Sequence, residues 1–202
     1  MRILDISLPL GARTPIWPGD PVFLLHPMRD STGVQVSRLI MGTHTGTHVD
    51  APRHLTVGGM SVDQLPLESL VGLAQVLDVS HCAEIGAAQL AAMLGSQFHR
   101  RVILKAGSSE EPNPLYLPLD LSAARWLVDH RVCLLATDCF SVEIPLGGGE
   151  LPVHQTLLGA GSVVVEGLRL TDVLPGAYLL AVLPLAIEEA DGAPARAILV
   201  EL

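Results

Sequence analysis

Three histidines and one aspartate lie within eleven residues of this 202-residue chain, in the stretch His44-Thr-Gly-Thr-His48-Val-Asp50-Ala-Pro-Arg-His54. Imidazole nitrogens and carboxylate oxygens are the ligands that divalent transition metals such as zinc take in proteins. The stretch therefore indicates a metal site. A polar loop whose histidines only cap backbone groups is the alternative, but capping does not account for the carboxylate.

The spacing of His44 and His48 limits the backbone that can join them. On a straight strand they share a face but lie roughly 13 Å apart, at about 3.3 Å per residue. A helix would bring them to about 6 Å, but the threonines and glycine between them are poor helix formers. Pro52 also restricts the preceding residue to extended geometry. We therefore expect a bent loop, in which Gly46 adopts a backbone angle that other residues avoid.

A second carboxylate, Glu166, directly follows Val163-Val-Val. This run reads as a buried strand, and an ionised carboxylate in such a run is costly unless it is paired or bound to a metal. Glu166 is therefore a candidate for the same polar site.

Short strands and a few helices must position these residues. Apolar and alternating runs predict several strands, and helix formers ended by glycine predict about three helices. There is no fixed-period repeat, so we expect one mixed α/β domain spanning residues 1–202. The expected strands include 2–8, 34–41, 102–105, 132–137 and 163–166, and the expected helices are 86–94, 122–130 and 153–158.

The composition of the chain limits which binding partners and which cellular compartment we expect. Charged residues make up only 16% of the chain, below the usual quarter, so we expect part of the surface to be covered in a homo-oligomer. The net charge of −9 argues against nucleic acid or an anionic membrane as a partner. The first residues lack the apolar core of a signal peptide, and three cysteines without a CxxC pair favour a reducing cytoplasm.

The stretch 44–54 resembles the HxGTHxDxPxH signature of the metal-dependent cyclase-type hydrolases, a family whose best-known members are bacterial kynurenine formamidases (arylformamidases). The resemblance extends over nearly the whole chain. It includes Trp17-Pro-Gly-Asp20, Asp138-x-x-Ser141, His154 followed twelve residues later by Glu166, and Asp191-Gly-Ala-Pro-x-Arg196.

The resemblance implies a fold and a set of ligands. The fold would be a β-barrel-like core of mixed strands with flanking helices, assembled as a homodimer or homotetramer. A first metal ion, zinc or alternatively manganese, would be bound by His44, His48 and Asp50. If a second ion is present, Asp50 would bridge to it, with His154 and Glu166 as the other ligands.

The resemblance also implies a reaction. The enzyme would hydrolyse N-formylkynurenine to kynurenine and formate with a metal-activated water, His54 would donate or accept protons, and Trp17 would line the substrate pocket. The alternative for His54 is a surface histidine that orients a metal ligand. The alternative for Trp17 is a residue that packs on the core. Two other functions stay open: an isatin hydrolase-like enzyme acting on a cyclic amide or lactone, and a non-catalytic zinc-binding module.

Some positions depart from the arylformamidase pattern and leave the substrate open. They are Lys105-Ala106-Gly107, the excursion 107–118 and Cys139-Phe140. Lys105 is either an anion anchor facing the pocket or a solvated strand end. The sequence assigns no role to Asp138 or Ser141.

Overall fold

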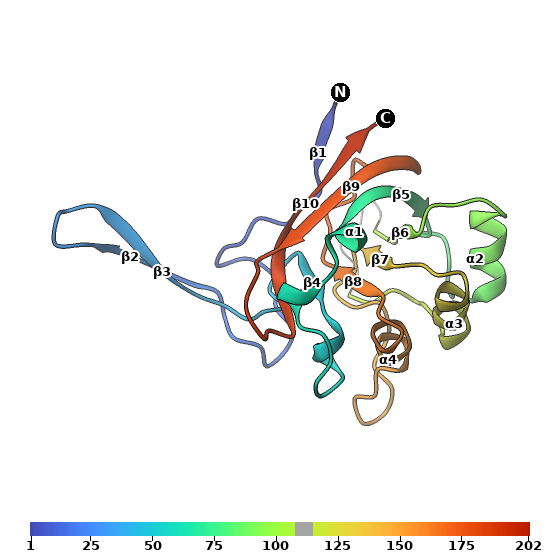
Figure 1. Cartoon of the computed structure of the whole chain (residues 1–202), viewed down its shortest axis with the longest axis horizontal. Coiled ribbons are helices and arrows are strands. Elements are labelled where there is room, and N and C mark those ends of the chain that lie inside the picture. Colours follow the sequence, from blue (N-terminus) through green and yellow to red (C-terminus); the bar gives the residue numbers. More distant parts are fainter. Residues whose placement is uncertain (108–114) are drawn as a thin grey trace.

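Seven strands close into a mixed β-barrel in the computed structural model, which describes residues 1–107 and 115–202 (Figure 1). The strand order around the barrel is β10-β4-β8-β7-β6-β5-β9, and β9 pairs with β10 to close it. Strands β5 to β8 run parallel to their neighbours in that series, and the remaining pairs are antiparallel. The predicted mixed α/β fold with a barrel-like core is confirmed. The strands are β4 (His48–Asp50), β5 (Val71–Asp78), β6 (Arg101–Lys105), β7 (Leu134–Thr137), β8 (Val163–Glu166), β9 (Gly176–Pro184) and β10 (Gly192–Glu201).

Successive side chains of the barrel strands point alternately into two apolar cores. Val163 and Val165 of β8 face the barrel interior, whereas Val164 faces the helices outside it. Ile103 of β6 likewise points inward. Both faces are buried, which explains why these strands read as continuous apolar runs in the sequence.

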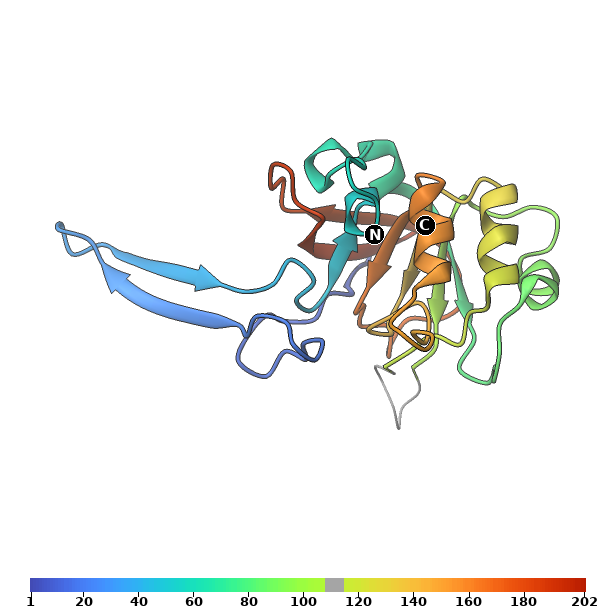
Figure 2. The ribbon, with the colours of Figure 1, turned by 90° about the horizontal axis from the view of Figure 1, so that it is seen from below.

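Helices cover one side of the barrel (Figure 2). They are α2 (Ala87–Leu94), α3 (Leu121–Asp129) and α4 (Pro152–Gly159), with the single turn α1 (Leu67–Leu70) elsewhere on the barrel. The three longer helices match the predicted ones, and Gly95 ends α2 as expected. The N-cap of α3 is Asp120, whose Oδ1 accepts a hydrogen bond from the amide of Ala123. None of the helices in the described residues combines the length and apolar character that a bilayer crossing requires.

The strand that precedes His44 does not belong to the barrel. Strands β2 (Leu24–Arg29) and β3 (Gln35–Ile40) pair with each other and form a ribbon that extends away from the body (Figures 1 and 2). The barrel edge is extended instead by β1 (Ile3–Asp5), which pairs with β10. The rigid support of the histidine stretch therefore comes from β4, which lies between β10 and β8, and not from the strand before it.

Candidate metal centre and cavity

The centre of the site is built on two neighbouring strands, β4 and β8. Val49 and Val165 point into the barrel core, so alternation along each strand turns His48, Asp50 and Glu166 to the opposite face. His48 and Glu166 are register partners. All three polar side chains are buried, and the amide of Val142 donates a 2.8 Å hydrogen bond to Glu166 Oε1.

A tight turn returns His44 to this face. Gly46 has φ +68°, the left-handed region that favours glycine. Thr47 fixes the turn, because its hydroxyl donates to the carbonyl of Gly167 at 2.5 Å and accepts from the amide of Leu8 at 2.8 Å. His44 Nδ1 then lies 2.8 Å from Asp50 Oδ1. The expected bent loop is confirmed as far as residue 47, whereas residues 48–50 form a strand.

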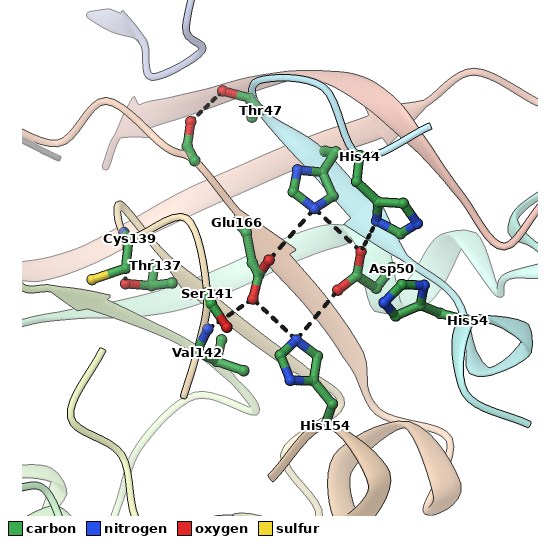
Figure 3. A network of polar contacts seen from close by, with 12 residues as sticks. His44, Thr47, Asp50, His54, Thr137, Cys139, Ser141, Val142, His154 and Glu166 are labelled. Carbon is green, nitrogen blue, oxygen red and sulfur yellow. Dashed lines mark hydrogen bonds and ion pairs between the residues drawn. The ribbon is translucent and has the colours of Figure 1, made fainter. Parts of the chain in front are cut away.

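His154 completes the cluster from α4. Its Nε2 lies 3.1 Å from Glu166 Oε1 and 3.8 Å from Asp50 Oδ2. Figure 3 shows Asp50 between His44 on one side and His154 on the other. The five residues proposed as ligands thus come together from a turn, two strands and a helix.

The donor set suits a divalent transition metal. Two groups, His44–His48–Asp50 and Asp50–His154–Glu166, each have three ligand atoms within 4.8 Å of one another, and Asp50 belongs to both. Three imidazoles and two carboxylates match the preferences of zinc and manganese better than those of calcium. The residues present therefore fit one ion or a bridged pair.

The histidine rings are oriented by hydrogen bonds that direct one nitrogen toward the carboxylates. His48 Nδ1 lies 2.9 Å from the carbonyl of Gly46, which leaves Nε2 facing Asp50 at 3.3 Å and Glu166 at 3.5 Å. A backbone carbonyl only accepts hydrogen bonds, so Nδ1 is the protonated nitrogen of this ring and Nε2 is the one that faces the carboxylates.

The carboxylates raise the basicity of these rings. Burial lowers the pKa of His44, but the charge of Asp50 and hydrogen bonds to Asp191 and Asp50 outweigh it and raise the pKa to about 9. Burial is likewise outweighed at His154, where contacts with Glu143 and Glu166 raise the pKa to about 10. The raised pKa values show that the carboxylates favour positive charge at this site.

Two carboxylates of the site were missed by sequence reasoning. Glu143 is buried and accepts from the backbone amides of Val153 and His154 and contacts His154 Nδ1 at 2.8 Å. Asp191 Oδ2 lies 3.0 Å from His44 Nε2 and 3.5 Å from His54 Nδ1. Asp191 stood in a segment already singled out, whereas nothing in the spacing of Glu143 marked it.

His54 lies at the edge of the cluster, at the end of a 3-10 turn formed by Pro52–His54. Its ring centroid is 4.2 Å from that of His44, and its side chain is 26% exposed. Figure 3 shows His54 beside Asp50, on the side of His44. His54 is therefore the histidine of the motif that solvent and small molecules can reach most easily.

A cavity of about 320 Å³ opens on the cluster and is lined by Trp17, Phe140, Ser141, His54 and ligand candidates. Its size lies at the lower end of the range for small-molecule sites. Trp17 is half-buried, and its ring meets Tyr116 edge-on at 6.0 Å. Trp17 thus belongs to the cavity wall rather than to either apolar core.

Lys105 and Asp138 lie outside the lining of this cavity. Lys105 is the partly exposed last residue of β6, and its ammonium donates to the carbonyls of Thr171 and Val173, so it does not serve as an anchor in the pocket. Asp138 accepts from the amides of Ala106 and Gly107, which fixes the end of β6. Much of the divergent excursion, residues 108–114, lies outside the described residues.

Comparison with known proteins identifies relatives over nearly the whole chain. The model of the Cyclase family matches residues 4–144. A kynurenine formamidase of Salinibacter ruber is 39% identical over 98% of this chain and 97% of its own, and one of Geobacillus thermodenitrificans is 37% identical over 97% and 96%.

Solved structures agree with the fold. A potential metal-dependent hydrolase with cyclase activity superposes with a TM-score of 0.81, at 32% identity over 98% of this chain and 96% of that chain. An isatin hydrolase bound to the product analogue thioisatinate has a TM-score of 0.80 at 22% identity, covering 98% and 91%. The latter likeness is one of fold.

Proposed function

Because the chain belongs to the Cyclase family, we propose that it is a metal-dependent amide hydrolase of the arylformamidase type. Its substrate would be N-formylkynurenine, which water cleaves to kynurenine and formate. One observation carries the proposal: a buried cluster of three histidines and two carboxylates opens on a small-molecule cavity that also holds His54. The relatives named kynurenine formamidase support the choice of substrate.

The metal would be zinc, with manganese as the alternative. His44, His48 and Asp50 would hold one ion, and Asp50, His154 and Glu166 a second. When bound, such an ion supplies Lewis acidity, which polarises a carbonyl and lowers the pKa of water to about 7. The ligands on β4 and β8 are held by the pairing of these strands, and His154 is held by α4, so the ligand groups are in place before substrate binds.

His54 would carry the protons of the reaction. Hydrolysis adds one water across the C–N bond, so the attacking water loses a proton and the leaving nitrogen gains one. Asp191 faces Nδ1 of His54, which leaves Nε2 as the nitrogen that exchanges protons with a molecule in the cavity. A positioned base of this kind contributes about 10²–10⁴-fold in rate.

The cavity wall would orient the aryl group. Trp17 presents an aromatic face on the same cavity as the ligand cluster, with Phe140 also in the wall. Offset or edge-on aromatic packing favours a flat aryl ring over an aliphatic chain. This contact would hold the formamide carbonyl toward the cluster.

Residues 1–202 would act as one catalytic unit in the cytoplasm, assembled as a homodimer or homotetramer. No nucleic acid or membrane partner is proposed, since the net charge is −9. The low share of charged residues, 16%, supports the assembly.

The test is product analysis of the purified protein with N-formylkynurenine and with isatin in parallel. We expect formate and kynurenine in equal amounts, and loss of the reaction after chelation. Ring opening of isatin without formate release would replace the substrate with a cyclic amide. Metal binding without turnover of either compound would identify a non-catalytic metal-binding module.

A further inference from the structure

Trp17 and Asp20 are the first and last residues of a tight turn on the wall of the cavity that opens on the ligand cluster. The amide of Asp20 donates a 3.0 Å hydrogen bond to the carbonyl of Trp17, and Gly19 has φ +99°. Pro18 and Gly19 are residues that a type II turn prefers at its two central positions. Such a turn holds the α-carbons of its end residues within about 7 Å, and both of these residues line the cavity. An aromatic side chain and a carboxylate are therefore presented together.

The carboxylate of Asp20 is not used by the turn itself. Among the described residues, none donates a hydrogen bond to this carboxylate or forms an ion pair with it, although the residue is partly buried. Aspartates in turns usually bond to the backbone that follows them. Asp30, Asp78 and Asp120 each do so, and each also accepts from a hydroxyl. Asp20 is thus available to a molecule in the cavity.

The charge of Asp20 is also separate from the charges of the metal centre. Four other carboxylates contact the histidines of the cluster, and they are Asp50, Glu143, Glu166 and Asp191. Their four negative charges equal the positive charge of two divalent ions, and a single ion would leave the centre more negative. Asp20 belongs to none of the ligand groups, so its charge is not offset when the site is filled.

The described wall of the cavity contains no cationic side chain to bind a carboxylate. None of its described lining residues is lysine or arginine, and the sequence of residues 108–114 contains neither. Arg53, next to His54, is directed elsewhere, because its guanidinium donates to the carbonyl of Glu189. In the described residues the cavity therefore has a partner for a positive charge and none for a negative one.

The proposed substrate, N-formylkynurenine, carries an ammonium and a carboxylate on the side chain of its aryl ring. An ammonium close to an aryl ring matches the pair Trp17 and Asp20. The carboxylate of Asp20 accepts charge-assisted hydrogen bonds from an ammonium, and the face of an indole ring attracts a cation. The substrate carboxylate has no corresponding partner among the lining residues.

We propose that Asp20 determines specificity by binding the ammonium group of an aryl formamide whose ring packs against Trp17. This inference rests on the proposed function and narrows its substrate class to formanilides with a cationic side chain. The carboxylate of N-formylkynurenine is dispensable, and the corresponding amine without it is an equal or better substrate.

Four aryl formamides that differ in charge test this assignment. They are N-formylkynuramine, which keeps only the ammonium, N-formylkynurenine, which has both charges, formanilide, which has neither, and 2-formamidobenzoate, which has only a carboxylate. We expect kcat/KM to be at least as high for the first as for the second, and to fall from the second to the fourth. A lower value for N-formylkynuramine than for N-formylkynurenine would overturn the proposal, because it would show that the carboxylate is bound.

Asp20→Asn removes the charge and keeps the size of the side chain. The ratio of kcat/KM for N-formylkynuramine to kcat/KM for formanilide should fall about tenfold, as for a partly exposed hydrogen bond to a charged group. Asp129→Asn is the matched control, because Asp129 is exposed, lies outside the cavity lining and loses the same charge. It should keep the ratio of the unmodified protein. Equal ratios in the two variants would show that Asp20 is only a solvated turn residue.

Reversal of the charge gives a second test. Asp20→Lys should favour 2-formamidobenzoate over N-formylkynuramine, which inverts the order seen in the unmodified protein. An order that stays as in the unmodified protein would count against a direct contact between Asp20 and the charged group.

Calorimetry with the amine product kynuramine separates this inference from the reaction. The Kd of kynuramine for the metal-loaded protein should rise about tenfold in Asp20→Asn and should not change in Asp129→Asn. Hydrolysis of all four formamides without a charge preference would reject the role of Asp20 and leave the amide hydrolase standing. Absence of turnover of all four would reject the proposed function, and the calorimetric comparison would still decide whether Asp20 binds an ammonium group.

Discussion

Glu143 Oε1 and His154 Nδ1 lie 2.8 Å apart, although the two residues are eleven positions apart in the sequence and α4 begins between them. The same carboxylate accepts from the backbone amides of Val153 and His154. It therefore fixes both the first turn of the helix and the orientation of the imidazole, and it directs Nε2 toward Glu166 and Asp50. Glu143 acts through His154 and is a positioning residue.

Replacing Glu143 with glutamine removes the charge that holds this ring while keeping the shape of the side chain. We expect metal affinity to fall about 10- to 100-fold, as is common when a carboxylate behind a histidine ligand is lost. The pKa of His154 should also fall, since its contact with Glu143 raises it. Competition with a chelator measures the first effect and NMR titration the second.

Glu68→Gln is a control for this change, because Glu68 is exposed and remote from the cluster. An unchanged pKa of His154 in Glu143→Gln would show that Glu143 only caps the helix.

His54→Ala should lower turnover by about 10²–10⁴-fold and leave the metal content unchanged, because five other residues supply the ligand groups. Steady-state kinetics and elemental analysis of the same sample check both parts. The exposed His81, changed to alanine, should behave like the unmodified protein. Loss of metal from His54→Ala would make His54 a ligand, in the group that it forms with His44 and Asp191.

Gly192→Ala tests how closely β10 supports His44. A Cβ atom at this position would lie 2.7 Å from the carbonyl oxygen of Val49 and 2.8 Å from His44 Cε1. Backbone and ring must both shift, so we expect a loss of about 1–3 kcal/mol in unfolding free energy, measured by urea denaturation, together with weaker metal binding. Gly11→Ala is the matched control, since its Cβ would meet nothing within 4 Å. Equal stability of both variants would refute this packing.

Asp5 links β1 to β10 through two hydrogen bonds from Arg196, of 3.0 and 2.7 Å. Partial burial raises the pKa of Asp5, but the hydrogen bonds from Arg196 and Ser7 outweigh it and lower the pKa below its ordinary value. The stabilisation is therefore present above the unfolded-state pKa and is lost as pH falls through the folded one. It is small, because the Asp5 side chain is 39% exposed.

Asp5→Asn should reduce the unfolding free energy at pH 7 and should abolish part of its decline between pH 5 and pH 2. Urea denaturation across that range measures both. A parallel decline in the two proteins would show that the pair contributes nothing.

The sequence predicted most of the elements because their signals are local. Val163–Glu166 appears as predicted, since a short apolar run ending in a charge specifies a strand without reference to the rest of the chain. The ligand set came from the resemblance, and the bend at Gly46 came from steric argument. The helix expected at residues 122–130 is α3, which begins one residue earlier, at Leu121, after its N-cap Asp120.

The sequence could not predict features that depend on distant contacts. Glu143, in the segment before α4, contacts His154 on that helix, and Asp191 contacts His44 although 147 positions separate them. Strand β3 of the ribbon was expected as an ordinary strand, because alternation in residues 34–41 identifies a strand but not the sheet that it joins. Whether a strand enters the barrel is a property of its pairing partners.

Metal content measured on the protein used for the formate assay tests the central claim most directly. We predict one or two equivalents of zinc or manganese per chain, loss of formate release from N-formylkynurenine when a chelator removes the metal, and recovery when the metal is returned. Full activity in protein shown by elemental analysis to lack divalent metal would contradict the account.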